Sequence, residues 1–155
     1  ARYGISLVII DIPATIFKPL VWAILLMARI INVIVKAGSA HQDEAMEVLN
    51  FIKAVMNQRA QLKLEQPSIY LIVNQAFPND NTANELKARG TPLAGTFVLP
   101  YSPAVHYITD YMKDIAVKYD VNDKYFKQWK DTIISIASNE YEVARAVRKP
   151  VWRRL

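Results

Sequence analysis

The sequence predicts an α/β protein with a mostly parallel sheet of about four strands, flanked by helices and followed by a helical C-terminal region. Short runs rich in β-branched residues recur along the chain, separated by segments whose apolar residues have helical spacing. These runs are apolar on both faces, which is typical of parallel strands covered by helices. With 155 residues, 52% of them hydrophobic, the chain is long enough for one domain with a substantial core.

The first strand is expected at Ile5–Asp11, an apolar run that ends abruptly at an aspartate. Residues 14–29 follow as a mostly buried helix with Pro19 near its first turn, and Ile30–Lys36 follows as the second strand. The apolar part of this helix is short and lies between Lys18 and Arg29, whereas a membrane-spanning helix needs about 20 apolar residues. We therefore expect a helix of the protein core.

A longer amphipathic helix is predicted after the break at Gly38, capped by Ser39 or Asp43 and running to about Leu62. Four charged residues, among them Arg59, are expected to lie largely off its apolar face. That face consists of residues at three- and four-residue spacing, namely Ala45, Val48, Leu49, Ile52, Val55 and Met56.

The remaining elements continue the alternation of strands and helices. Gly90 suits a left-handed helix end, Pro100 is expected to stop a strand, and Ser102 precedes a proline as a helix cap. The elements are a strand at 68–75, a short helix at 82–89, a strand at 93–99, and helices at 103–118 and 122–138. Consecutive strands joined through helices predict right-handed crossovers, and an edge of this small sheet could be left open for a further segment or a partner chain.

We expect two parts, an α/β nucleotide-binding-like domain at 1–138 and a basic tail at 139–155. The net charge is +5, all 14 acidic residues precede residue 145, and the last eleven residues are rich in arginine. A basic tail with a tryptophan predicts an anionic partner, either a membrane surface, a nucleic acid or an acidic protein face, although a solvated terminus is equally consistent. The contact residues would be Arg145, Arg148, Lys149, Trp152, Arg153 and Arg154.

Asp11 is the first candidate for chemistry, because ligands of open α/β sheets bind at the carboxyl ends of strands. There it could hold Mg²⁺ or position a hydrolytic water, and it could equally cap the following helix. The chain has no cysteine and only two histidines, and none of its four glycines precedes Lys-Ser or Lys-Thr. Thiolate metal sites are therefore excluded, and a phosphate-binding loop is missing from this chain.

Asn74 and the turn Pro100-Tyr101-Ser102 are the second and third candidates, since each follows a predicted strand. An amide offers both a hydrogen-bond donor and an acceptor to the edge of a nucleotide base, and a tyrosine ring can line a base pocket. Each could also be a plain turn residue. Their shared position at the same edge of the sheet is what favours a binding site.

With these positions in place, the chain resembles the C-terminal half of the ParA/MinD family of deviant-Walker ATPases. "LVIIDIP" is similar to that family's Walker-B strand, "IYLIVNQ" to the strand that ends in an adenine-reading asparagine, and "GTFVLPYSPAV" to the strand and turn beside the base. "LLMARIINVIVKAGSAHQDEAMEVLNFI" is similar to the helix, strand and helix between them, although Arg29 stands where the family usually has aspartate. The pilus-assembly branch, TadZ and CpaE-like proteins, is the nearest in character.

The resemblance implies a portion of an ATPase that positions or assembles a cellular machine, for partitioning, secretion or a pilus, through nucleotide-dependent association. ATP and Mg²⁺ would be its cofactors, with Asp11 at the metal and Asn74, Pro100, Tyr101 and Ser102 at the base. Self-association or a larger assembly is implied, in the cytoplasm or at the periphery of a membrane. The family's phosphate loop belongs to a half that is absent here, so ATP hydrolysis requires an additional N-terminal segment, and we expect this chain to be an excerpt.

The alternative is a non-enzymatic α/β module that docks to a protein, membrane or nucleic acid through its basic tail. It predicts no nucleotide affinity. A nucleic-acid partner would show affinity that falls steeply with salt, whereas a lipid partner would require anionic vesicles.

Overall fold

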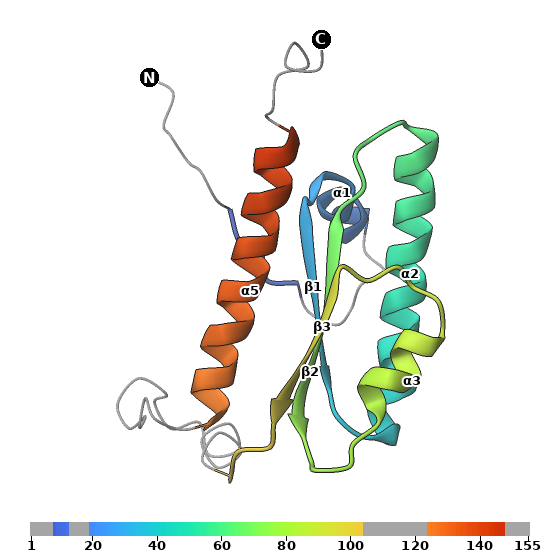
Figure 1. Ribbon diagram of the computed structural model, residues 1–155. Coiled ribbons are helices and arrows are strands. Elements are labelled where there is room, and N and C mark those ends of the chain that lie inside the picture. The colour runs from blue at the N-terminus through green and yellow to red at the C-terminus, as the bar shows by residue number, and fades with distance from the viewer. Residues whose placement is uncertain (1–7, 13–18, 104–123, 148–155) are drawn as a thin grey trace.

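The protein is seen in a computed structural model that describes residues 8–12, 19–103 and 124–147, with side chains described as far as Glu140. Figure 1 shows a small sheet between helices. The elements in chain order are α1 (Pro19–Met27), β1 (Ile30–Lys36), a 3-10 turn η1 (Ser39–His41), α2 (Gln42–Gln61), β2 (Ser68–Ala76), α3 (Thr82–Ala88), β3 (Gly95–Pro100) and α5 (Lys124–Val147).

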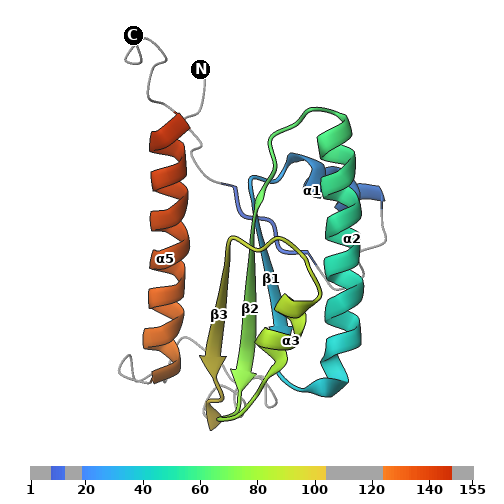
Figure 2. The ribbon, with the colours of Figure 1, turned by 45° about the vertical axis from the view of Figure 1, so that its right-hand side comes forward.

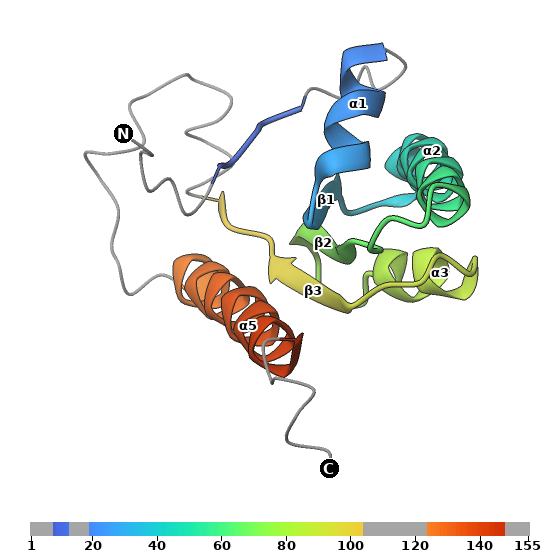
Figure 3. The same cartoon turned by 90° about the horizontal axis from the view of Figure 1, so that it is seen from above.

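The three strands are parallel and follow one another across the sheet in the order β1-β2-β3. The register pairs Ile30 with Ser68 and Lys36 with Asn74, and on the other side of β2 it pairs Tyr70 with Gly95. Figures 2 and 3 show α2 and α3 on one face of the sheet and α5 on the other. The predicted fold class, a mostly parallel sheet flanked by helices with a helical C-terminal region, is confirmed.

The larger core lies between the sheet and helices α1 and α2. Alternate residues of β1 and β2 point into it, which is the two-residue period of a strand. The predicted apolar face of α2 meets them, with Leu49 and Val55 fully buried. The buried strand and helix residues of this core include Ile31, Val33, Val35, Ile69, Leu71, Val73, Val21, Leu25, Ala45 and Ile52.

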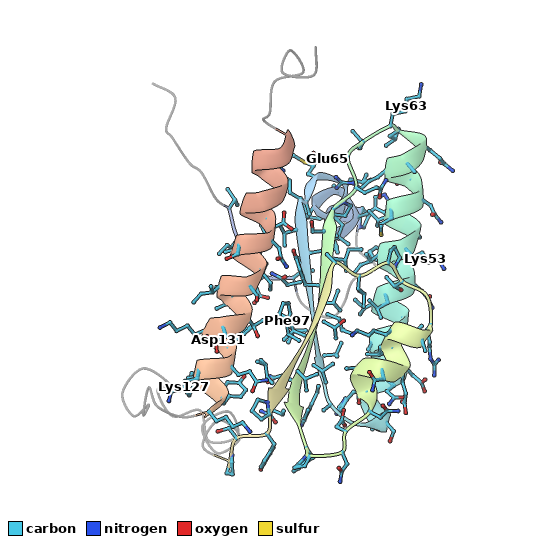
Figure 4. All side chains as sticks on the ribbon, viewed as in Figure 1. Lys53, Lys63, Glu65, Phe97, Lys127 and Asp131 are labelled. Carbon is cyan, nitrogen blue, oxygen red and sulfur yellow. The ribbon has the colours of Figure 1, made fainter. Side chains whose placement is uncertain are left out.

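A smaller core lies on the opposite face, under α5. Tyr70, Ile72 and Leu99 of the sheet pack against Tyr125 and Ile136 of the helix. Figure 4 shows Phe97 between β3 and α5, whereas Lys127 and Asp131 lie on the outer side of the helix. Polar contacts also fasten α5 to the sheet, because Tyr70 Oη donates to Glu140 Oε1 at 2.9 Å and Gln128 Nε2 donates to the Val98 carbonyl at 2.7 Å.

Gly95 makes room for the ring of Tyr70 in this smaller core. A Cβ at residue 95 would lie 3.1 Å from Tyr70 Cδ1 and 3.2 Å from Cε1, which is tighter than ordinary van der Waals contact. The absent side chain therefore allows an aromatic ring of β2 to lie over β3.

Arg59 of α2 is buried, with 5% of its surface exposed, although we expected it to lie off the apolar face. Its Nη1 donates to the carbonyls of Leu25 at 3.1 Å, Leu26 at 2.9 Å and Ala28 at 2.8 Å, at the end of α1. Its Nε donates to the Glu65 carbonyl at 2.9 Å, and Nη2 donates to the same oxygen. Burial lowers the pKa of the guanidinium, and the Glu65 carboxylate opposes that shift. The side chain thus caps α1 and holds it against α2.

The expected first strand is wrong for the part of it that the structure describes. Val8–Asp11 is not in a strand, and Val8, Ile9 and Ile10 are 70%, 84% and 52% exposed. The strand was predicted from the apolar composition of this run, but a strand forms only where a neighbouring strand supplies hydrogen bonds to its backbone. Within the described ranges the sheet has three strands rather than about four.

Several boundaries also differ from expectation. Neither Ser39 nor Asp43 caps α2, because the η1 turn comes first and His41 occupies the cap position without a side-chain hydrogen bond. In α1 the described residues include only two that are buried, Val21 and Leu25, so that helix is less buried than predicted. β3 begins at Gly95 and includes Pro100 instead of stopping before it.

The end of α3 and the bounds of the C-terminal helices can also be compared with the expectations. Gly90 does adopt the left-handed conformation after α3, with a φ of 80°. The expected helix at 103–118 falls outside the described residues except at its first position. α5 runs without a break from Lys124 to Val147, so it continues beyond the helix end expected at about residue 138.

Candidate functional site

Two of the three predicted segments come together at the carboxyl end of the sheet. β2 and β3 run parallel and end at the same edge, at the bottom of Figure 1. Asn74 lies two residues before the end of β2, and Pro100 ends β3, directly followed by Tyr101 and Ser102. The backbone N–H of Tyr101 donates to the Ala76 carbonyl at 2.9 Å, which joins the two segments beyond the regular pairing.

The end of β2 has an irregular backbone. The pairing with β3 shifts register between Val73 and Ala76, and Gln75 within that shift has a φ of 57°. A left-handed residue other than glycine costs free energy and is uncommon in a strand. Such bulges redirect the side chains beside them and are frequent next to binding sites. The irregularity directly follows Asn74, the residue expected to read a base.

Asn74 is held by a side chain from the far end of the chain. Tyr125 Oη donates to Asn74 Oδ1 at 3.0 Å, and Tyr125 is 6% exposed at the start of α5. Within the described residues no hydrogen bond engages Asn74 Nδ2. The amide therefore has one end fixed by the protein and keeps its donor end for another group. The sequence analysis did not single out Tyr125, because its contact with Asn74 depends on how α5 packs on the sheet.

An aromatic pair lies beside these residues. The rings of Phe77 and Tyr101 stack with centroids 4.6 Å apart and planes inclined by 20°. Phe77 is 62% exposed, which is high for a large apolar side chain, so one aromatic surface is open to solvent at this edge. Ser102, by contrast, is buried, with 4% exposure.

Lys36 is a further residue of this edge that the sequence analysis did not single out. It ends β1, it is exposed, and the register places it directly beside Asn74. Residues opposite each other in neighbouring strands point to the same face, so a cation lies next to the amide. Its position as the last residue of an apolar strand is the signal that could have identified it.

The loops around this edge are fastened to one another. The backbone N–H of Gly38 donates to Thr82 Oγ1 at 3.1 Å, and Thr82 is itself buried, with its N–H donating to Asp80 Oδ1 at 3.0 Å. The N–H of Ala37 donates to the Asn74 carbonyl at 2.9 Å. These bonds connect the segments that follow β1 and β2, so the candidate site is built on a fixed backbone.

Asp11, predicted as catalytic residue and metal ligand, is not brought to this edge. It is exposed and lies outside any strand. In Figures 1 and 2 the segment 8–12 runs level with the upper half of the sheet, away from the end where β2 and β3 finish. Over the ranges that the structure describes, no group of three or more His, Cys, Asp or Glu side chains could hold a metal ion.

The basic contact residues of the tail cannot be placed. Arg145 lies in α5, where only the backbone is described, and the other five fall outside the described residues, namely Arg148, Lys149, Trp152, Arg153 and Arg154. None of the helices in the described parts of the chain is long and apolar enough to cross a membrane.

No protein-family model, curated protein or solved structure matches this chain. The likeness to the ParA/MinD family thus depends on the sequence segments quoted above. The functional argument depends on the geometry at the carboxyl end of β2 and β3.

Proposed function

We propose that this chain forms the base-binding side of a nucleotide-binding protein similar to the ParA/MinD ATPases. In this proposal, nucleotide-dependent association positions or assembles a larger machine for partitioning, secretion or pilus formation. The observation that carries the proposal is the meeting of Asn74 with Phe77 and Tyr101 at one sheet edge. The protein would work in the cytoplasm or at the periphery of a membrane.

The chemistry of this edge suits a nucleotide base. An exposed aromatic ring offers a face on which a base can stack, and such stacking is worth about 1–3 kcal/mol per base. The Asn74 amide offers directional hydrogen bonds to the edge of the base, which an aromatic surface alone does not. Lys36, beside Asn74, provides a positive charge for the phosphates of the same ligand.

Hydrolysis of ATP is not proposed for this chain alone. Its glycines do not form a phosphate-binding loop with a following lysine, so the groups that stabilise the transferred phosphoryl would come from another segment. The proposed role of Asp11 at Mg²⁺ requires residues 5–11 to become the strand that the sequence predicts. ATPase activity is therefore expected only when an N-terminal phosphate-loop segment is supplied.

Equilibrium titration of a fluorescent ATP analogue tests the base site. We expect Asn74→Ala and Phe77→Ala each to weaken binding about tenfold, which corresponds to about 1.4 kcal/mol. Asn57→Ala and Leu62→Ala are matched controls, since both residues are exposed on or just after α2, far from the edge. Binding that is equally strong in all four variants would place the nucleotide elsewhere, and no saturable binding at all would refute the proposal.

A non-enzymatic interaction module is the second candidate function, and β1 favours it. Ile34 of β1 is 56% exposed, although strands of parallel sheets are normally covered on both faces. In the described residues β1 pairs with β2 alone, so its other edge is available to a partner. This candidate predicts association without nucleotide. Sedimentation of the nucleotide-free wild type, of Ile34→Lys and of the equally exposed control Ile133→Lys tests this candidate. If β1 is the docking surface, only Ile34→Lys should reduce association.

The basic tail is proposed to contact an anionic membrane surface or nucleic acid, as its sequence suggests. Replacing Arg148, Lys149, Arg153 and Arg154 together by Gln should abolish binding to anionic vesicles or to DNA and leave the fold intact. Binding that persists in this variant would contradict the tail proposal. The two partners differ in what binding requires: affinity for a nucleic acid falls steeply as salt rises, whereas a lipid partner requires anionic vesicles.

A further inference from the structure

Two backbone hydrogen bonds show which groups of β1 point away from β2. The Arg29 carbonyl accepts from the Ser68 N–H, and the Ala37 N–H donates to the Asn74 carbonyl, each at 2.9 Å. Odd-numbered residues therefore direct their backbone groups toward β2. Because successive residues of a strand point these groups to opposite sides, the even-numbered residues direct theirs to the outer edge. Within the described residues, that edge is paired with no strand.

The outer edge of β1 lacks the features that usually prevent an edge strand from pairing. Such strands are commonly protected by prolines, by charges within the strand or by bulges. β1 contains no proline, its one charged residue is its last, and its pairing with β2 runs without a bulge. The outward-facing residues Asn32, Ile34 and Lys36 also have exposed side chains, and Ile34 is 56% exposed. This edge can therefore accept a further strand.

The carboxyl half of the edge is its more accessible part. Figures 1 and 2 show α1 and the segment 8–12 level with the upper half of the sheet, whereas β1 continues to the lower end. Ile34 belongs to that lower half and is the one exposed large apolar residue of β1. A strand centred on Ile34 thus has more room than one centred on the start of β1.

We propose that this edge pairs antiparallel with the same edge of a second copy of the chain, about a two-fold axis at Ile34. The inference rests on the β1 surface of the second candidate function and names the partner of that surface. Ile34 then lies opposite Ile34 of the second copy, and Asn32 lies opposite Lys36 of the second copy. Each opposed pair exchanges both backbone hydrogen bonds, and the two three-stranded sheets join into one.

The edge is complementary to itself in this register. Two Ile34 side chains cover each other, and each Asn32 amide oxygen can accept from the Lys36 ammonium opposite it. The two Lys36 residues lie four positions apart along the joined strands, about 13 Å at about 3.3 Å per residue, so these like charges do not oppose each other. Because both copies use the same surface, the interface closes as a dimer.

Dimerisation through this edge requires no nucleotide. The aromatic pair of the base site, Phe77 and Tyr101, follows β2 and β3, whereas the proposed interface is the side of β1 that faces away from both strands. Edge pairing takes its affinity from main-chain hydrogen bonds, with side chains such as Ile34 supplying the specificity.

Sedimentation equilibrium of the nucleotide-free full chain tests whether the dimer forms. The contact is smaller than a standard interface of about 1,600 Å², so we expect a dissociation constant on the order of 10 μM. Ile34→Lys sets like charges opposite each other at the axis and should weaken the dimer about tenfold or more. Ile133→Lys, at a residue of α5 with the same 56% exposure, should leave it unchanged. A wild type that stays monomeric at about 200 μM, or equal loss in both variants, overturns the proposal.

Cysteine cross-linking tests the register, because the chain has no cysteine of its own. Opposed residues of a hydrogen-bonded antiparallel pair have Cα atoms about 5.5 Å apart, within the range of about 4.4–6.8 Å that a disulfide spans. Ile34→Cys should therefore form a covalent dimer on mild oxidation. Asn32→Cys is the matched control on the same strand and face, and it should not, since its two copies lie about 13 Å apart.

The double variant Asn32→Cys/Lys36→Cys should form the covalent dimer again, because these two positions oppose each other between copies but are about 13 Å apart within one strand. Cross-linking of Asn32→Cys as fast as that of Ile34→Cys, or none in Ile34→Cys, would contradict the register and overturn the proposal.

Titration with the fluorescent ATP analogue separates this inference from the base site. Ile34→Lys should bind the analogue as tightly as the wild type, because Ile34 is not part of that site. A dimer that binds no nucleotide would refute the base site and leave the interface standing. A monomer that binds nucleotide would refute the interface and leave the base site standing.

Discussion

The burial of Arg59 leads to a strong prediction about stability. Replacement by Met keeps a long apolar side chain in the space but removes the donors to four carbonyls, those of Leu25, Leu26, Ala28 and Glu65. A hydrogen bond to a charged donor can contribute about 1.5–3 kcal/mol, but the desolvation that lowers the pKa of the guanidinium offsets part of this. At about 1 kcal/mol for each of the four carbonyls, Arg59→Met should lower the free energy of unfolding by about 4 kcal/mol.

Urea denaturation followed by circular dichroism measures this loss. With a slope of about 2 kcal/mol per molar urea, the midpoint should fall by about 2 M. The midpoint of Arg59→Lys, which keeps the positive charge but lacks the planar guanidinium group, should fall by less. Arg29→Met is the control, because Arg29 is exposed, and it should change stability by less than about 0.5 kcal/mol. An Arg59→Met midpoint equal to that of Arg29→Met would refute the reasoning, since it would mean that the carbonyls need no donor.

Three further changes have expected outcomes that the same assay measures. Gly95→Ala should destabilise by about 1–2 kcal/mol, since its Cβ would press on the Tyr70 ring, and an unchanged midpoint would show that the ring moves aside freely. Lys63→Gly should stabilise by about 0.5–1 kcal/mol, because Lys63 has a φ of 56° after α2, and a loss of stability would contradict this. Burial, and then Glu140, raise the pKa of Tyr70 above its ordinary 10.0, so the unfolded state ionises first and stability should decline as the pH rises above 10. Tyr70→Phe should show a smaller decline over that pH range, and an identical decline would assign the effect to other groups.

The elements that the sequence predicted well are those whose pattern is local. β1, β2 and α2 lie within one or two residues of their expected bounds at one end or both, because alternation and helical spacing are properties of the element itself. The left-handed Gly90 was likewise predictable, since that conformation favours glycine.

The failures arise where structure depends on a distant partner. The apolar run at Ile5–Asp11 has the composition of a strand, yet Val8–Asp11 has no strand pairing, because pairing depends on what lies beside it. Arg59 lies four residues after Val55 and therefore on the apolar face of α2, but its charge suggested exposure. Carbonyls at the end of α1, which sequence spacing does not reveal, are what make its burial favourable.

The residues of the candidate site likewise include some that the sequence could predict and some that it could not. Asn74 and Tyr101 could be predicted because the ends of parallel strands meet at one edge. Tyr125 could not, since its contact with Asn74 depends on how α5 docks on the sheet. The position of Lys36 could not be predicted either, because only the register of β1 against β2 shows which residue lies beside Asn74.

The most direct test of the central claim is to map nucleotide binding residue by residue. Backbone amide shifts of the isotope-labelled chain would be followed by NMR during titration with ATP and Mg²⁺. The account predicts that the shifts cluster at Lys36, Asn74, Phe77 and Tyr101, at the carboxyl end of the sheet. Absence of shifts at saturating nucleotide, or a cluster on the outer surface of α2, would contradict it.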